Sequence, residues 1–148
     1  VAVMYDGRVV QIGTPQELFE RPQHTFVGYF IGSPGMNVIS ADITGKVANV
    51  HGTSLALNRG YKDLNGKVEI GVSPEFVSLT EGDGLPVNVR RVEDVGRHKI
   101  VRADLFGNEI NILAGEGVEV SPDMNRVTFD PQHVNVYVND WLKAGEVA

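Results

Sequence analysis

The chain has 148 residues, of which 42% are hydrophobic, and this length and composition suit one domain with its own core. It has no cysteine, which excludes disulfide bonds and cysteine-ligated zinc. Its formal net charge of −6 disfavours a dedicated nucleic-acid binder, and no apolar run approaches the roughly 20 residues of a membrane-spanning helix.

The first residues predict a β-hairpin. Two short apolar runs, VAVMY and RVVQI, lie on either side of Asp6 and Gly7. An Asp-Gly pair between such runs is typical of a two-residue hairpin turn, because both turn positions need a positive φ. Since strand-like sequence is already under way at Val1, without a methionine, we expect the chain to be a piece of a longer protein.

A short helix is predicted directly after the hairpin, in the stretch TPQELFE. Thr14 can cap its N-terminus, Pro15 suits its first position, and Glu17 completes a capping box. Pro22 cannot continue a helix, because it lacks a backbone N–H and its ring clashes with the preceding turn. We therefore expect the helix to end before Pro22.

A second short helix is predicted in HTFVGYFIG. This stretch places Phe26, Val27 and Phe30 on one face, and Gly32 is a natural C-terminal stop. The proline and glycine that follow, in GSPG, suit a type II turn. The helical part of the chain therefore ends here.

Strand-like sequence takes over after Pro34. Apolar and polar residues alternate in short runs, as they do in half-buried strands. The runs are NVISADITG, KVANVHG, TSLALN, KVEIGV, FVSLT, LPVNVRRVED, HKIVRADLF, NEINILAG, RVTFD and VNVYV. Their regular spacing predicts a mainly β fold, either a five-stranded oligonucleotide-binding (OB) type of barrel or a larger paired-barrel relative.

A weak internal repeat indicates that this β region contains a duplication. VSPEFVSL aligns without gaps on FDPQHVNV. In each copy a cap residue, Ser73 or Asp130, precedes a proline, Pro74 or Pro131, that suits the first position of one helical turn. Together with Glu75, these residues are predicted to form two equivalent corners between strands.

The chain offers little for catalysis. It has no G-x-x-x-x-G-K-[ST] phosphate loop, and Ser33 lacks the G-x-S-x-G spacing of a nucleophile elbow. The four histidines have no partner at metal-ligand spacing: His24, His51, His98 and His133. We therefore expect no catalytic residue, no metal site and no cofactor site in this chain.

One basic cluster, RRVEDVGRHKIVR, could suit a nucleic-acid groove. Such grooves combine cations with aromatic side chains on which bases stack. Here valine and isoleucine alternate with the cations, and Phe106 is the nearest aromatic residue. A solvated hairpin is therefore the favoured interpretation.

The stretch DGRVVQIGTPQELFERPQHTFVGYFIGSPGMN closely resembles the end of the ATP-binding subunit of sugar-importing ABC transporters, of the maltose and glycerol-3-phosphate type. That family carries D-G-R-[IV]-x-Q-x-G-x-P, then E-L-[YF]-x-x-P, then F-V-A-x-F-I-G-S-P-x-M-N. The matching residues are Gln11, Gly13, Pro15, Glu17, Leu18, Pro22, Phe26, Val27, Phe30, Gly32, Ser33, Pro34, Met36 and Asn37.

Later parts of the chain resemble the family less closely. GVSPEFVSL is similar to its G-[IV]-R-P-E corner, and VTFDPQHVNVY is similar to its closing strands. Ser73 stands where the family usually has arginine, and Phe76 stands where some members have histidine. Any contact made by that arginine is therefore not expected here.

The resemblance implies a division of the chain and a role for it. Residues 1–31 would be the end of the nucleotide-binding domain, 32–37 a junction, and 38–148 a regulatory β domain of the OB-like TOBE type. The ATP-binding motifs would precede Val1, so ATP and magnesium would belong to the parent chain, a transport ATPase. This part would be a non-catalytic regulatory and dimerisation domain.

The same resemblance implies partners and a location. These are a second copy of the subunit, membrane permease subunits and a regulatory protein, at the cytoplasmic face of the cell membrane. Residues 1–31 would either be swapped onto the second copy or pack on their own barrel. Two alternatives stay open: a TOBE module that binds a small ligand or oxyanion, for which HGTS is the one suitable turn, and an OB-type nucleic-acid binder.

Overall fold

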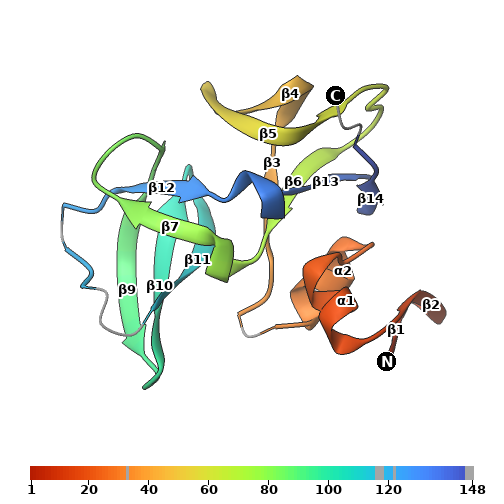
Figure 1. Ribbon diagram of the computed structural model, residues 1–148, viewed down its shortest axis with the longest axis horizontal. Coiled ribbons are helices and arrows are strands. Elements are labelled where there is room, and N and C mark those ends of the chain that lie inside the picture. Colours follow the sequence, from red (N-terminus) through yellow and green to blue (C-terminus); the bar gives the residue numbers. More distant parts are fainter. Residues whose placement is uncertain (33, 116–118, 122, 146–148) are drawn as a thin grey trace. The chain divides into compact units, whose positions relative to one another are not determined.

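The computed structural model describes residues 1–32, 34–115, 119–121 and 123–145. The chain divides into two compact units (Figure 1). Unit 1 comprises Val1–Ser73 and Pro131–Ala148, and unit 2 comprises Pro74–Asp130. The chain passes between the units at the two corners that the repeat predicted.

Unit 1 contains both α-helices and most of the N-terminal strands (Figure 1). Its elements are β1 (Ala2–Tyr5), β2 (Arg8–Ile12), α1 (Pro15–Glu20), α2 (Thr25–Phe30), β3 (Asn37–Ser40), β4 (Asp42–Val50), β5 (Thr53–Tyr61), β6 (Val68–Val72), the 3-10 turn η2 (Pro131–His133), β13 (Asn135–Val138) and β14 (Trp141–Lys143). The strands form a β1-β2 hairpin, a β4-β5 hairpin and a sheet in the order β14-β13-β6-β3.

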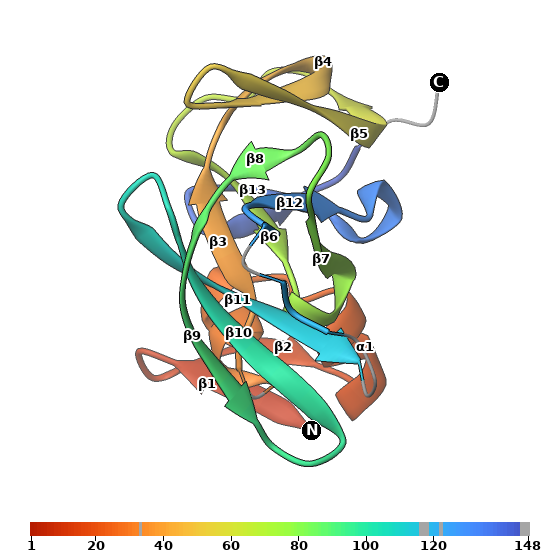
Figure 2. The same cartoon turned by 90° about the vertical axis from the view of Figure 1, so that its left-hand side faces the viewer.

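Unit 2 begins with the 3-10 turn η1 (Pro74–Phe76) and is otherwise made of strands (Figure 2). These are β7 (Val77–Thr80), β8 (Leu85–Pro86), β9 (Asn88–Asp94), β10 (His98–Leu105), β11 (Asn108–Gly115) and β12 (Arg126–Phe129). They pair as two small sheets, β11-β10-β9 and β7-β12-β8. The predicted mainly β fold is confirmed, and the small sheets are consistent with an OB-like barrel.

The N-terminal elements form where the sequence predicted them. Asp6 and Gly7 have φ values of 51° and 76°, the positive pair that the hairpin turn requires. At α1, the Glu17 backbone N–H donates to Thr14 Oγ1 at 3.2 Å, and Pro15 occupies the first helical position. Gly32 follows α2 with a φ of 111°, as expected of a C-terminal stop.

One predicted turn is wrong. A type II turn at Pro34-Gly35 would need a positive φ at Gly35, and Gly35 does not have one. The glycine is needed for space instead, because a Cβ there would lie 2.5 Å from the carbonyl oxygen of Tyr29 in α2. The motif therefore brings the chain close against the backbone of the helix.

The repeat corresponds to two strand–corner–strand segments, each with a single 3-10 turn at its proline. The strands before and after the corners pair reciprocally. In unit 1, β6 pairs antiparallel with β13, and in unit 2, β7 pairs antiparallel with β12. This reciprocal pairing is what a duplication would produce.

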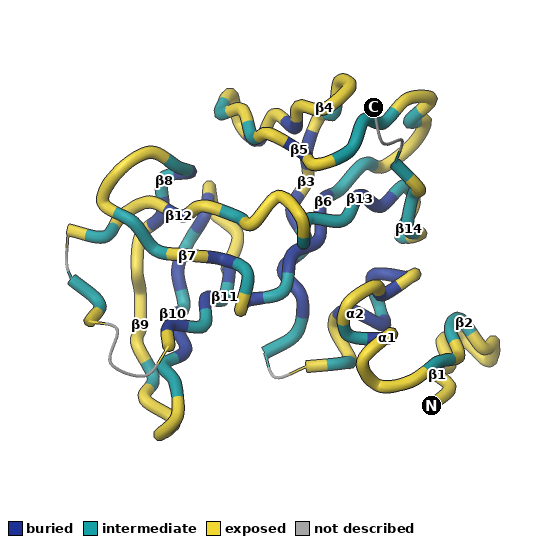
Figure 3. The backbone as a smooth tube through the Cα atoms, viewed as in Figure 1, coloured by how far each residue is buried: buried dark blue, intermediate teal, exposed yellow. Residues whose placement is uncertain are grey.

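Each unit has its own buried side chains (Figure 3). The buried residues of unit 1 include Ile39, Val50, Ile70, Val72, Val136 and Tyr137. Those of unit 2 include Val77, Leu85, Val101, Leu105, Ile110 and Val127. A smaller cluster of Val3, Leu18 and Val27 lies under the N-terminal hairpin and helices of unit 1.

Candidate functional site

The junction predicted from the family motif lies where α2 leads into β3. The Met36 backbone N–H donates to the carbonyl oxygen of Gly28 at 2.9 Å, which fixes the chain against α2. Asn37 is buried and starts β3, where it pairs with Val72, the residue before Ser73. Ser33 lies outside the described residues. The motif therefore joins α2 to β3, the edge strand of the four-stranded sheet of unit 1.

The Met36 side chain fills a slot between two glycines. Its thioether end lies against Gly28 of α2, where an added Cβ would collide with it. At Gly71 of β6, an added Cβ would lie 2.7 Å from both Met36 Sδ and Tyr137 Cε2. Met36 is 4% exposed, so it is a packing residue between the helix and the sheet.

Tyr137 on β13 joins the same packing, and sequence reasoning did not single it out. Its side chain is fully buried, and its hydroxyl group donates to the carbonyl oxygen of Pro22 at 2.5 Å. Met36 Sδ lies 3.7 Å from the same hydroxyl oxygen. Burial raises the pKa of the Tyr137 phenol far above its ordinary value of 10.0. Pro22, predicted only as a helix stop, is thus also an anchor for the sheet.

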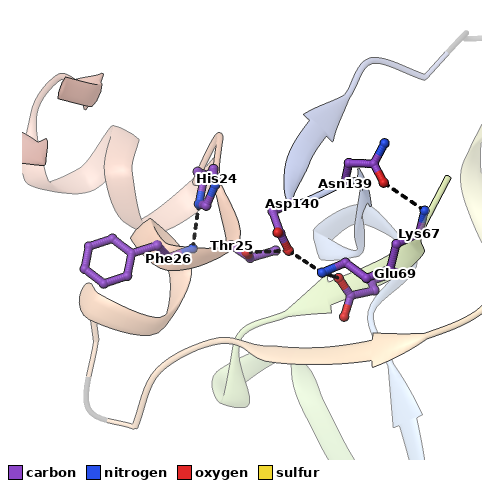
Figure 4. A network of polar contacts seen from close by, with 7 residues as sticks. All are labelled: His24, Thr25, Phe26, Lys67, Glu69, Asn139 and Asp140. Carbon is purple, nitrogen blue, oxygen red and sulfur yellow. Dashed lines mark hydrogen bonds and ion pairs between the residues drawn. The ribbon is translucent and has the colours of Figure 1, made fainter. Parts of the chain in front are cut away.

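Asp140, in the β13–β14 turn, holds the N-terminus of α2 (Figure 4). The Thr25 backbone N–H donates to the Asp140 carbonyl oxygen at 2.9 Å, and Thr25 Oγ1 lies 3.2 Å from Asp140 Oδ1. Lys67 Nζ donates to the same carboxylate at 2.8 Å. The hydrogen bond from Lys67 lowers the pKa of Asp140, and the hydrogen bond to Asp140 raises the pKa of Lys67.

The ion pair between Lys67 and Asp140 adds little to the stability of the fold. The side chains of Lys67 and Asp140 are 54% and 40% exposed, so solvent screens their attraction. Glu69 Oε1 is buried without a hydrogen bond to any residue that the structure describes, and it lies 3.6 Å from Lys67 Nζ. Backbone hydrogen bonds also join these elements, among them the 2.8 Å bond from the Leu142 N–H to the Gln23 carbonyl oxygen.

An aromatic face extends from this junction over α2, β1 and β14. We define it by Tyr5, His24, Phe26, Phe30 and Trp141, whose neighbouring rings lie 4.7–5.9 Å apart between centroids. His24 also caps α2, since its Nδ1 accepts the Phe26 N–H at 3.0 Å. Phe30 is 67% exposed and Trp141 is 49% exposed. Tyr5 is also exposed while His24 is buried, and exposed aromatic groups of this kind are candidates for an interaction site.

The hairpin beside this face is also apolar on its outer side. Val1, Met4, Val9 and Ile12 are all exposed. The predicted shared face of α2 is therefore divided: Val27 is buried in the small N-terminal cluster, while Phe30 points outward and stacks on Phe26.

The basic cluster forms the β9–β10 hairpin of unit 2, and three of its arginines pair with carboxylates. The Arg102 guanidinium group contacts both oxygens of Glu93 at 3.3 Å, and Arg91 contacts Glu93 at 2.6 Å. Arg90 lies 3.3 Å from Asp104. The hydrogen bond from Arg102 lowers the pKa of Glu93. Two of these pairs join β9 to β10 and the Arg91–Glu93 pair lies within β9, and together they agree with the favoured interpretation, a solvated hairpin.

Within the described parts of the chain, no group of histidine and acidic side chains is arranged to hold a metal ion. No helix among those residues is long and apolar enough to cross a membrane. The described residues therefore offer two candidate features for function: the aromatic face, and the packing of α2 against the sheet of unit 1.

Comparisons with known proteins identify the family. The sn-glycerol-3-phosphate import ATP-binding protein UgpC 2 of Agrobacterium fabrum is 36% identical over 127 residues, which cover 82% of this chain and 34% of that protein. UgpC of Ruegeria sp. TM1040 is 32% identical over 139 residues, 91% of this chain and 39% of that protein. The chain belongs to the family of ABC import ATP-binding proteins.

An uncharacterized ABC transporter ATP-binding protein of Sinorhizobium fredii, y4oS, is 35% identical over 128 residues, 82% of this chain and 34% of that protein. No protein-family model matches the chain. The chain spans between about a third and two-fifths of the length of these curated ABC import ATP-binding relatives. The predicted resemblance to a C-terminal portion of this family is confirmed.

The corners show where the chain departs from the motif pattern of its family. Ser73, in the position where the motif usually has arginine, is half-buried at the end of β6, and Pro74 is buried after it. Glu75 and Pro131 are exposed. The Asp130 backbone N–H donates to the Phe76 carbonyl oxygen at 3.0 Å, which ties the two corners together at the backbone.

Replacing Asp130 with alanine should lower the free energy of unfolding by about 1 kcal/mol, because Asp130 precedes η2 in the position of a cap. Urea denaturation of the variant and the parent chain provides the measurement. An Asp130→Asn variant is the matched control, since asparagine caps equally well. An unchanged midpoint in Asp130→Ala would show that no cap exists there.

Proposed function

We propose that the chain is a non-catalytic regulatory and dimerisation portion of an ABC importer ATP-binding subunit. The observation that carries this proposal is the match of most of the chain to about a third of each ABC import ATP-binding relative. The phosphate loop that binds nucleotides is absent from its sequence. In this proposal the matched portion contributes something other than phosphoryl transfer from ATP.

The whole subunit, in this proposal, binds ATP and magnesium and hydrolyses ATP to drive import through membrane permease subunits. It sits at the cytoplasmic face of the membrane by contact with those subunits. Relatives are named for import of sn-glycerol 3-phosphate, so a small polar solute of that kind is the proposed cargo.

We assign residues 1–31 to the end of the nucleotide-binding domain, 32–37 to the junction and 38–148 to the regulatory β domain. Two features support this division. The first segment has its own small apolar cluster around Leu18 and Val27. Its exposed apolar groups are Tyr5 and Phe30 of the aromatic face and the apolar side of the hairpin, which suit packing against the rest of an ATPase core.

The packing of residues 1–31 against the sheet of unit 1 suggests how a regulatory partner could change the activity of the ATPase. Met36, Tyr137 and the Asp140 turn fix α2 to the sheet of unit 1 through side-chain and backbone contacts. A partner bound to this sheet would therefore act on the segment that continues into the ATPase core. No separate hinge is required for this coupling.

The purified chain should not bind Mg-ATP. Phosphoryl-transfer proteins hold the nucleotide by a phosphate-cradling loop and metal ligands, and this sequence contains no such loop. Isothermal titration calorimetry with Mg-ATP tests this, with Mg-AMP as the control for binding of the base alone. Micromolar affinity for ATP would contradict the assignment of the chain as the non-catalytic portion.

A further inference from the structure

Unit 1 contains a small cleft that the proposed function does not use. It has a volume of about 250 Å³ and lies between the end of α1, β5, η2 and β14. We call it the basic cleft and define it by Arg21, Arg59, Lys143, Tyr61 and Asn135, which are among its lining residues. Since β5 packs against η2, the walls of the cleft belong to the folded unit rather than to a loose terminus.

The cleft concentrates positive charge in a chain whose net charge is −6. Arg21, Arg59 and Lys143 come from three different elements, and Glu20 is the one carboxylate among the lining residues. Among the residues that the structure describes, none of these three cations forms an ion pair. This contrasts with the β9–β10 hairpin, where neighbouring carboxylates pair with the arginines.

The neutral lining residues add hydrogen-bond donors. They include the amides of Asn58, Gln132 and Asn135 and the hydroxyl group of Tyr61. Burial raises the pKa of Tyr61 while Arg59 and Arg21 act in the opposite direction, which places both guanidinium groups near the phenol. At pH 7 the phenol is therefore a neutral donor beside two cations.

The backbone keeps the cleft narrow and its side chains in place. Gly145 passes so close to β5 that an added Cβ would lie 2.7 Å from Arg59 Cβ and 2.8 Å from Tyr61 Cζ. Sites for drug-sized ligands usually have volumes of about 300–1,000 Å³, so this cleft suits a smaller occupant. Three convergent cations and neutral donors fit an anion that has several acceptor oxygens and two charges.

We propose that the basic cleft binds a small dianionic phosphate group, either inorganic phosphate or the phosphate of a small monoester. Arg59 of β5 and Lys143 of β14 contact the phosphate oxygens, and Arg21, which follows α1, contributes further positive charge. The site does not use the phosphate loop of nucleotide-binding proteins. Through it, the β domain would respond to the concentration of a small anion.

Titration of the whole chain with inorganic phosphate and with methyl phosphate tests this, by calorimetry and by amide chemical-shift mapping. Chloride at matched ionic strength is the control for screening. We expect saturable binding, with shifts concentrated in β5, η2 and β14. Tighter binding of methyl phosphate than of inorganic phosphate would identify a monoester as the ligand, and the reverse would identify free phosphate. Absence of saturation with both, or shifts elsewhere in the chain, would overturn the proposal.

Two single substitutions provide a matched pair. Arg59→Ala should weaken phosphate binding about tenfold or more, because hydrogen bonds between charged groups are the strong ones. Lys46→Ala removes one charge from the exposed part of β4, outside the cleft, and should change affinity less than about twofold, since screening weakens distant charges. Equal effects of the two variants would overturn the proposal. Shift mapping on the parent chain keeps the test valid if Arg59→Ala folds poorly.

The ionisation of phosphate supplies a further readout. A phosphate monoester loses its second charge as the pH falls through about 6, whereas sulfate remains doubly charged. Both anions meet the same lining side chains, Glu20 and His133 included, so the ratio of phosphate affinity to sulfate affinity should fall between pH 7.5 and pH 5.5. Parallel changes for the two anions would contradict selection of the dianion.

Discussion

Replacing Met36 with alanine should lower the free energy of unfolding by about 2–5 kcal/mol, the range for truncation of a buried methionine. The side chain fills the slot between Gly28 and Gly71 and touches the Tyr137 hydroxyl group. Neither glycine has a side chain that could move into the space, so the cavity would persist. Urea denaturation followed by tryptophan fluorescence gives the measurement, since Trp141 is the single tryptophan.

Met36→Leu is the matched control, because it preserves volume and should cost less than about 1.5 kcal/mol. Gly71→Ala tests the same slot from the other side. Its Cβ would lie 2.7 Å from Met36 Sδ, so overpacking should cost about 1–3 kcal/mol. If Met36→Ala and Met36→Leu were equally stable, the described packing between helix and sheet would be wrong.

Replacing Tyr137 with phenylalanine should cost about 1–3 kcal/mol, because the Pro22 carbonyl oxygen would lose its buried donor. Chemical denaturation at pH 7 measures this loss. The ring remains, so the substitution removes the hydrogen bond and little of the apolar contact. A variant as stable as the parent chain would mean that water or another group satisfies Pro22 equally well.

The same variant should alter the response to alkali. The Tyr137 pKa is raised in the folded state above its ordinary value of 10.0, so the folded chain keeps a proton that the unfolded chain releases. This contribution is complete below pH 10 and is lost as the pH rises toward the folded-state value. Stability of the parent chain should therefore fall above pH 10, and that of Tyr137→Phe should fall less steeply. Tyr29 and Tyr61, whose pKa values are also raised by burial, remain in both proteins. Parallel declines would contradict the buried position of Tyr137.

Local chemistry explains how far the sequence predicted the fold. The Asp6-Gly7 turn, the Thr14 cap and the prolines at the two corners act within a few residues, and the structure contains all of them. Gly35 does not form the predicted turn. A glycine is required there because the chain passes close to Tyr29 across the junction, and not because of the backbone angle of a turn. A glycine in a motif indicates either positive φ or close approach, and sequence alone does not separate the two.

The candidate site was predicted only in part. The family motif singled out Met36, but its partner Tyr137 lies 101 residues further along the chain. Asp140 likewise carries no local signal, since its contacts are with Thr25 and Lys67 on other elements. The sequence does not predict the basic cleft, because its three cations are far apart along the chain and line one cleft only in the folded unit.

The repeat was the strongest long-range signal in the sequence. Two similar corners predicted equivalent segments, and their reciprocal strand pairing agrees with that expectation. The division into two units with Ser73 and Asp130 at the boundaries was not predicted, because it depends on which strands pair. A pattern of alternating apolar and polar residues predicts a strand, but it does not predict which other strand it pairs with.

Light scattering on the purified chain at about 100 μM is the most direct test of the proposed dimerisation role, since self-association depends on concentration. We expect a mass twice the 16.1 kDa of one chain, because Phe30 and Trp141 of the aromatic face and the apolar hairpin are exposed and a two-fold interface can use one patch twice. Phe30→Asp, at a site 67% exposed and therefore tolerant of substitution, should reduce the mass to that of a monomer if the aromatic face makes the contact. A parent chain that stays monomeric at this concentration would contradict the proposal that this portion pairs two subunits.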